Sequence, residues 1–456
     1  MPKPKHTRKP FTKPKSKFRE KPDAAPKLNP KAGGKAGAKA NRKPQLKGMA
    51  PAPEYAAPAV PLVPALRLRD FTESVIREQT RMAHLHGAVN LAQGFPDFPC
   101  DPVLKEFAAK AVEADYNQYS VTWGMPSLRQ AIAKKVGEYN GIAADADKHV
   151  TVTCGATEAM ICAFMSSLDP GREVILFQPF YENYHPDAYL CGARPVYVTL
   201  REPDWAIDEA ELVRAFGPKT AAIVICTPHN PTGKVFTRAE LEMIAKLCVR
   251  WNARVFSDEI YEHILYDGAV HVSPASIPGL EDRTVTIGSA SKTYGITGWR
   301  VGWAVAHESI TDGLRKVHDF MTVCAATPLQ EAVRGALGLG PEFYRDLASH
   351  YKSRRDFIVS GLEAAGFKCH VPRGAYYVMA DVADMIKGRY RDDAELAREL
   401  VIKTKVAAVP GSSFYKAKGG PKGMGEHSHK LRFCFCKKEE TLALAVERLG
   451  EFRRGL

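Results

Sequence analysis

Short apolar runs recur along the chain from Leu66 onward, and stretches with helical spacing of apolar positions separate several of them. A short apolar run bounded by turn residues is typical of a buried strand. Its alternation with helices, most clearly at 157–168 and 238–251, predicts an α/β fold with a mostly parallel, doubly wound sheet. The seven predicted strands are 149–153, 173–177, 195–199, 221–226, 254–257, 284–288 and 301–306.

The pattern changes after residue 326, where amphipathic helices at 329–337 and 344–365 precede alternating strands at 375–380 and 431–436. This order predicts a smaller α+β domain. The segment 71–86 also has helical spacing, and we expect it to pack with that domain. The predicted parts are a tail over 1–66, an N-terminal arm over 67–110, a large domain over 111–326 and a small domain over 327–456.

The net charge of +13 belongs to the first fifty residues. They hold 13 lysines and 3 arginines against Glu20 and Asp23, which leaves the rest of the chain near neutral. Lys-Pro pairs and a Gly-Ala-Lys stretch at 31–40 give this tail too little apolar surface to fold, so we expect disorder. Its charge would suit a nucleic acid or an acidic partner, although such segments are more often solubilising extensions.

No apolar run approaches the roughly 18 residues that a membrane span needs. The first fifty residues contain one serine, and their basic residues are mostly lysine, unlike an Arg- and Ser-rich transit peptide. We therefore expect a cytoplasmic protein, with an organellar location as the alternative if the tail is a targeting segment. The ten cysteines form no CxxC pair, and several lie in apolar segments, which predicts buried, reduced thiols without a metal.

Polar residues that directly follow predicted strands are the first candidates for a functional site, because doubly wound sheets bind ligands at the carboxyl ends of their strands. The residues in such positions are Gly155, Ala156, Thr157, Tyr181, Asn230, Asp258, Ser289, Ala290, Ser291 and Lys292. The first three lie between a strand and a helix, where the helix N-terminus favours an anion.

Four motifs add a family resemblance. They are NLAQGFPDF at 90–98, PHNPTGK at 228–234, SDEIY at 257–261 and SASKTYGITGWRVGW at 289–303. With these motifs in this order, the region 67–456 resembles the class I and II aminotransferases of fold type I, nearest to the kynurenine, glutamine and methionine aminotransferase group. The resemblance implies pyridoxal 5′-phosphate as the cofactor.

In this family a lysine forms a Schiff base with the aldehyde of the cofactor, and the resemblance gives that role to Lys292. The released amine then moves a proton from the substrate Cα, which requires a pKa lowered by desolvation. Asp258 would lie at the ring nitrogen of the cofactor, where a carboxylate keeps the ring protonated as an electron sink. Tyr261 and Asn230 would donate hydrogen bonds to the phenolic oxygen.

The resemblance also implies how the rest of the cofactor is bound. Tyr181 would lie flat on the ring. Tyr119 would reach the phosphate of a neighbouring subunit, which implies a homodimer. The phosphate would be held by Gly155, Ala156, Thr157, Ser289, Ser291 and Arg300, the arginine being suited to two oxygens at once.

For the substrate, the resemblance places Arg432 at the α-carboxylate as a bidentate partner, with Asn230 beside it. Gly94 would let the backbone approach the same carboxylate. The sequence points to no second cation for a distal carboxylate, so we expect a neutral or aromatic substrate such as methionine, glutamine or kynurenine. The aromatic residues that suit such a side chain are Phe95, Tyr119, Trp123 and Tyr181.

The predicted function is therefore transfer of an amino group from an amino acid to a 2-oxo acid. Two alternatives stay open. The same residues serve β-elimination from cysteine S-conjugates, and the motifs do not separate the two reactions. A ligand-sensing domain of a nucleic-acid-binding regulator would need a folded winged helix ahead of it, which the Pro-rich segment 1–66 does not predict.

Overall fold

The computed structural model describes residues 65–68, 73–416 and 429–455. The tail predicted over 1–66 lies outside them except for its last two residues, so its disorder and its charged partners stay predictions. The described residues form one compact unit. The predicted boundaries of the arm (67–110), the large domain (111–326) and the small domain (327–456) stay predictions as well.

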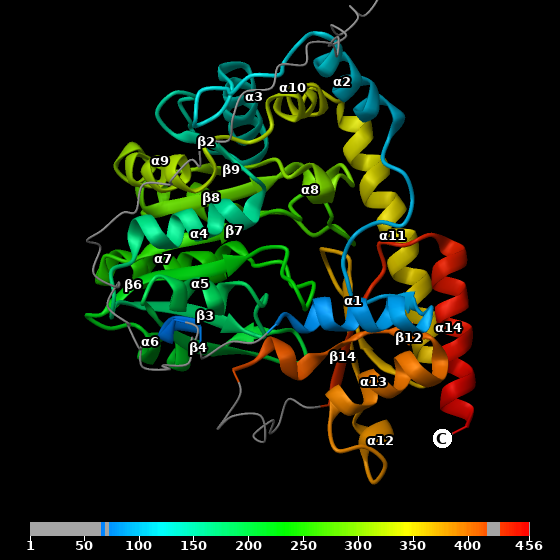
Figure 1. Cartoon of the computed structure of the whole chain (residues 1–456). Coiled ribbons are helices and arrows are strands. Elements are labelled where there is room, and N and C mark those ends of the chain that lie inside the picture. The colour runs from blue at the N-terminus through cyan, green and yellow to red at the C-terminus, as the bar shows by residue number, and fades with distance from the viewer. Residues whose placement is uncertain (1–64, 69–72, 417–428, 456) are drawn as a thin grey trace, which may run out of the picture. The chain divides into compact units, whose positions relative to one another are not determined.

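The largest sheet of the described chain is mixed and has eight strands. It forms the centre of the larger α/β part (Figure 1). All seven predicted strands are present, and the α/β class is confirmed. Five neighbouring strands run parallel, whereas β9 lies antiparallel between β8 and β2. The eighth strand, β5, was not predicted because its two residues are too short for a periodic pattern. In spatial order the strands are β2 (Val150–Thr153), β9 (Gly302–Val305), β8 (Thr284–Ser289), β7 (Arg254–Asp258), β6 (Thr220–Cys226), β3 (Glu173–Gln178), β4 (Arg194–Arg201) and β5 (Ala206–Ile207).

Helices cover both faces of this sheet, as its continuous apolar strands require. Successive residues of a strand point to opposite faces, so the neighbours Val255 and Phe256 of β7 belong to two separate apolar cores. The helices on the Phe256 face are α4 (Ala156–Ser167), α5 (Tyr184–Leu190) and α9 (Glu308–Thr322). Those on the Val255 face are α6 (Glu209–Ala215) and α7 (Arg238–Trp251).

A second, four-stranded antiparallel sheet follows in the order β10-β11-β14-β13. Its apolar face packs against α11, α13 and α14. The N-terminal helix α1 packs on α13, and the short strand β1 after it pairs in parallel with β12. The bounds are β10 (Lys368–His370), β11 (Tyr377–Asp381), β14 (Lys430–Cys434), β13 (Val409–Pro410), β1 (Val89–Asn90), β12 (Val406–Ala407), α1 (Val75–His86), α11 (Pro341–Ala364), α13 (Asp393–Thr404) and α14 (Glu439–Arg454).

The remaining helices are short or lie at the edges of the fold. Across the described ranges, no helix is long and apolar enough to cross a membrane. All ten cysteines are free thiols. The remaining helices are α2 (Pro102–Glu113), α3 (Pro126–Lys135), α8 (Ala290–Thr293), α10 (Thr327–Ala336) and α12 (Ala383–Ile386), with single turns at Leu66–Leu68, Val136–Asn140, Pro274–Ser276, Glu281–Arg283, Thr297–Trp299 and Gly411–Phe414.

The fold brings most of the predicted site residues to one edge of the large sheet. Parallel strands end at the same edge, so β7 ends at Asp258 and β8 at Ser289 side by side. The neighbouring β6 ends at Cys226, four residues before Asn230. Strand β14 of the second sheet brings Arg432 to the same place, where its guanidinium donates a hydrogen bond to Asn230.

Candidate active site

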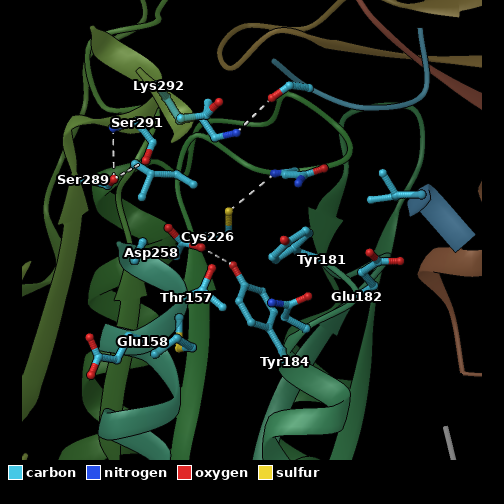
Figure 2. Close-up of a pocket in the computed structure, with 18 of the residues that line it drawn as sticks. Thr157, Glu158, Tyr181, Glu182, Tyr184, Cys226, Asp258, Ser289, Ser291 and Lys292 are labelled. Atoms are coloured by element: carbon cyan, nitrogen blue, oxygen red, sulfur yellow. Dashed lines mark hydrogen bonds between the residues drawn. The ribbon is translucent and has the colours of Figure 1, made fainter. Parts of the chain in front are cut away.

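A cavity of about 710 Å³ lies at this edge of the sheet (Figure 2). Segments more than 300 residues apart meet in it, since Gly94 and Arg432 both line its wall. The predicted site residues that line the cavity are Gly94, Ala156, Thr157, Tyr181, Asn230, Asp258, Tyr261, Ser289, Ser291, Lys292, Arg300 and Arg432.

Lys292 lies on the one-turn helix α8, which follows β8 directly. Its Nζ donates a hydrogen bond to the carbonyl oxygen of Gly94 at 3.0 Å, drawn as a dashed line in Figure 2. The side chain is only half-buried because the cavity itself is open space. Protein atoms nevertheless surround the amine, and this desolvation lowers the pKa of Lys292 to about 8. A larger fraction of the amine is therefore neutral near pH 7 than in an exposed lysine.

Asp258 lies deeper and is almost fully buried. Its Oδ2 accepts a hydrogen bond of 2.6 Å from the hydroxyl of Tyr184 (Figure 2). Its Oδ1 is buried and has no partner among the described residues. Burial raises the pKa of Asp258 to about 6, while the bond from Tyr184 opposes this rise. A buried carboxylate oxygen without a donor is costly, so this atom is suited to accept from a bound group.

The start of α4 has features that suit an anion. Gly155 is its N-cap with a φ of +81°. A Cβ at that position would lie 2.3 Å from a guanidinium nitrogen of Arg300, so the arginine packs directly on the bare glycine. The hydroxyl oxygens of Ser289 and Ser291 lie 2.8 Å apart at the same end of the cavity. Free helix N–H groups and a guanidinium together favour a phosphate.

Arg432 is buried with 1% of its surface exposed. Nη1 donates to Asn230 Oδ1 at 2.7 Å, and Nη2 donates to the Ala92 carbonyl at 2.6 Å. Its guanidinium lies over the ring of Tyr377, 4.3 Å from the ring centroid. Nε is buried and has no partner in the described part of the chain. Two of the five guanidinium N–H groups therefore hold the arginine in place, and the N–H of Nε is among those left for a ligand.

The family model for aminotransferase class I and II matches residues 87–449. The chain belongs to this family. A probable N-succinyldiaminopimelate aminotransferase of Mycobacterium tuberculosis is 38% identical over 84% of this chain and 97% of its own length. Human kynurenine–oxoglutarate transaminase 1 is 35% identical over 82% of this chain and 95% of its own. The structure of YbdL from Escherichia coli, for which a methionine aminotransferase function was identified, matches with a TM-score of 0.79 at 35% identity, covering 86% and 100% of the two chains.

This aminotransferase uses pyridoxal phosphate, the cofactor of its family. When bound, the cofactor supplies an aldehyde that bonds to amines and a protonated ring that withdraws electrons from a neighbouring carbon. The cavity fits that group in two respects. The partnerless Oδ1 of Asp258 can accept from a ring N–H, and the cradle of Gly155 and Arg300 can hold a phosphate. Pyridoxal phosphate had been predicted from the motifs, and the family membership confirms it.

Two predicted aromatic residues of this aminotransferase do not line the cavity. Tyr119 is 82% exposed, so within its own subunit it contacts neither the cavity nor Lys292. Its predicted place beside a partner's phosphate stays a prediction. Trp123 was expected beside the substrate, but it packs under the guanidinium of Arg315, 4.9 Å from the ring centroid. Trp123 therefore does not line the pocket of its own subunit, and that prediction is wrong. An aromatic side chain can equally pack against a cation.

Several residues of the site were not predicted. Tyr184 follows Tyr181 by three residues, and this helical spacing was the available signal that both face the cavity. Tyr377 donates to or accepts from Tyr261 at 2.8 Å, but its position in an alternating strand looked like ordinary core packing. Arg77 and Glu182 also line the cavity, but they belong to none of the four motifs.

Proposed function

We propose that this aminotransferase transfers the amino group of a neutral or aromatic amino acid, such as methionine, glutamine or kynurenine, to a 2-oxo acid. The supporting observation is the charge of the cavity beyond Arg432. Among the described residues that line the cavity, Arg77 is the one cation besides Lys292, Arg300 and Arg432, and the carboxylate of Glu182 lines it as well. This part of the wall therefore has no excess positive charge for a distal carboxylate. The names of the kynurenine and methionine relatives agree with the proposal.

In this proposal Lys292 bonds the cofactor and then moves the proton at the substrate Cα. Its lowered pKa keeps a usable fraction of neutral amine. The carbonyl of Gly94 accepts from Lys292 and from the hydroxyl of Tyr376, so it orients the amine when the amine is free. Gly94 itself has no room for a side chain, because a Cβ would lie 2.1 Å from the hydroxyl of Tyr377.

Tyr261 and Asn230 are proposed to donate to the phenolic oxygen of the cofactor. Burial raises the pKa of Tyr261 well above its usual value, which keeps its hydroxyl protonated as a donor. Tyr377 lies 2.8 Å away and orients that hydroxyl. The Oδ1 of Asn230 is occupied by Arg432, which leaves the Nδ2 donor for the cofactor.

The remaining contacts follow from the geometry above. Tyr181 is proposed to lie on the cofactor ring, and it meets Tyr184 edge to face with ring centroids 5.6 Å apart. Arg432 would bind the α-carboxylate through its free Nε and through the side of its guanidinium that faces Asn230. The phosphate would lie against the residues that gather at the start of α4, which are Gly155, Ala156, Thr157, Ser289, Ser291 and Arg300.

Tyr184→Phe tests the role of Asp258 in this proposal. The variant removes a hydrogen bond that favours the charged carboxylate, so the pKa of Asp258 rises further and the cofactor ring is less protonated. We expect kcat to fall roughly tenfold, the effect of one hydrogen bond to a charged group, with KM little changed. The pH titration of the absorbance of the bound cofactor should shift as well. Tyr189→Phe, on the same helix but outside the cavity, is the matched control, and equal behaviour of the two variants would contradict the assignment.

We further propose a homodimer in which Tyr119 reaches the partner's phosphate site. The segment that carries Tyr119 lies against the end of α9, since His318 Nε2 donates to the Thr122 carbonyl at 2.8 Å. That end of α9 exposes 92% of Phe320, while Met321 lines the cavity. Exposed apolar side chains of this size are typical of an interface.

Tyr119→Phe should leave this dimer intact and raise the dissociation constant of pyridoxal phosphate roughly tenfold, the effect of one lost hydrogen bond to an anion. Sedimentation measures the dimer, and absorbance measures the cofactor. Tyr116→Phe, three residues earlier and outside the cavity, should behave as the wild type. A monomer with full cofactor affinity would refute the proposed interface.

A half-reaction panel tests the substrate class. The loaded protein is mixed with one amino acid at a time, and conversion of the cofactor to its amine form is followed by absorbance. We expect methionine, glutamine or kynurenine to react faster than aspartate and glutamate. Faster reaction of the acidic amino acids would overturn the proposal and assign Arg77 to a distal carboxylate. Pyruvate and ammonia released from a cysteine S-conjugate without a 2-oxo acid would show elimination as well.

A further inference from the structure

A buried polar group lies beside the proposed phosphate site and has no role in the proposed chemistry. Glu158 is the third residue of α4, lines the cavity and is 6% exposed. Its carboxylate faces three donors: the backbone N–H of Cys154, the hydroxyl of Thr322 and Nδ1 of His318, the last at 2.8 Å. His318 comes from α9 and is fully buried.

The hydrogen bonds of His318 indicate its charge. Nε2 lies 2.8 Å from the carbonyl of Thr122, which can only accept, so this nitrogen carries a proton. Nδ1 faces Glu158, whose two other donors favour the ionised carboxylate. Burial alone would raise the pKa of Glu158, but the bonds from His318 and Thr322 outweigh it and lower that pKa. Burial alone would lower the pKa of His318, but Glu158 raises it instead. Both directions describe an imidazolium paired with a carboxylate.

This pair joins three segments that belong to the proposed phosphate site. Glu158 holds the peptide of Cys154 through its N–H, and the carbonyl of Cys154 accepts a 3.4 Å hydrogen bond from Nη2 of Arg300. His318 holds the Thr122 carbonyl, three residues after Tyr119. The orientation of Arg300, the start of α4 and the Tyr119 segment therefore depend on one buried pair.

The charge of Glu158 is otherwise unfavourable here. A carboxylate in the first turn suits the helix dipole, but it repels a phosphate bound at the same helix end. The imidazolium of His318 cancels that charge at a distance of 2.8 Å. Without the proton of His318, one uncompensated negative charge would remain close to the phosphate.

We propose that Glu158 and His318 are positioning residues for the cofactor phosphate, and that this aminotransferase binds pyridoxal phosphate tightly only while His318 is protonated. The proposal rests on the phosphate site assigned above to α4 and Arg300. The groups that face His318 are Glu158 on α4, the Thr122 carbonyl from the Tyr119 segment, and Asp319 and Thr322 on its own helix.

The direction of the pH effect follows from this charge. A raised pKa means that the imidazolium persists to a higher pH than in an exposed histidine, and that it is lost as the pH rises through that value. Affinity for the phosphate should fall over the same interval. Toward acid, the pair is lost only when the pH falls through the lowered pKa of Glu158.

The test measures the dissociation constant of pyridoxal phosphate for the cofactor-free protein by absorbance, across a pH series. His318→Gln should raise the constant on the order of tenfold at neutral pH, as expected for one unpaired charge in the first turn of the helix that would hold the phosphate. The double variant Glu158→Gln, His318→Gln should recover most of this loss and show a weaker pH dependence than the wild type. Pyridoxal, which lacks the phosphate, should bind equally to all three proteins.

Two results would overturn the inference. One is equal affinity and equal pH dependence in the wild type and in His318→Gln. The other is a double variant as weak as the single one toward both pyridoxal and its phosphate, which would show a loss of fold instead of a charge effect. Arg300→Met separates this inference from the proposed function, because full cofactor affinity in that variant would refute the phosphate site itself.

Discussion

Lys292→Ala is expected to reduce turnover by roughly 10⁴-fold, the upper range for removal of a group that transfers a proton. The variant has no amine to bond the cofactor and no base at the substrate Cα. The protein should still fold, because Lys292 makes one side-chain hydrogen bond, to the Gly94 carbonyl. The absorbance band of the imine between Lys292 and the cofactor should disappear as well.

Two controls sharpen this experiment. Lys316→Ala removes an exposed lysine paired with Asp312 and should keep wild-type rates. Adding a small primary amine to Lys292→Ala should restore part of the proton transfer, since the pocket remains open. Wild-type turnover in Lys292→Ala would refute the assignment of the catalytic lysine.

Arg432→Lys is the second change with a large expected effect. A lysine keeps the positive charge but cannot bond Asn230, the Ala92 carbonyl and a carboxylate at once, as the planar guanidinium can. Disruption of a buried, hydrogen-bonded ion site typically costs about 2–5 kcal/mol, so kcat/KM should fall roughly a hundred- to a thousandfold for every amino acid.

The half-reactions distinguish a substrate role from a structural one. The loss should appear for amino acids and 2-oxo acids alike, while the affinity for pyridoxal phosphate changes less, because the hydrogen bonds of Arg432 go to Asn230 and Ala92 and not to the start of α4. An amine without a carboxylate should react equally slowly with the wild type and with Arg432→Lys. A variant that loses cofactor affinity but not selectivity for carboxylates would contradict the assignment.

The strands and the core of the chemistry were predictable because their signals are local. Each strand of the large sheet except β5 is a short apolar run. Helix α7 begins and ends at the predicted residues, with a capping box of Thr237 and Glu240 at its start and Asn252 in the left-handed conformation at its end. Asp258 and Ser289 end neighbouring strands, so the position of a residue in its strand already places it at the ligand-binding edge. Lys292 then follows from a motif that includes the end of a strand.

The sequence alone therefore determined the fold class and the cofactor, and it pointed to residues that the structure gathers around one cavity. Tertiary structure decided what each of these residues bonds to. Tyr184 bonds to Asp258 across 74 positions, and His318 pairs with Glu158 across 160. No periodicity connects residues so far apart, because their contact depends on how α5 and α9 pack on the sheet. The same reason removed Trp123 from the pocket, since the spacing of an aromatic residue does not reveal whether its ring meets a substrate or a guanidinium.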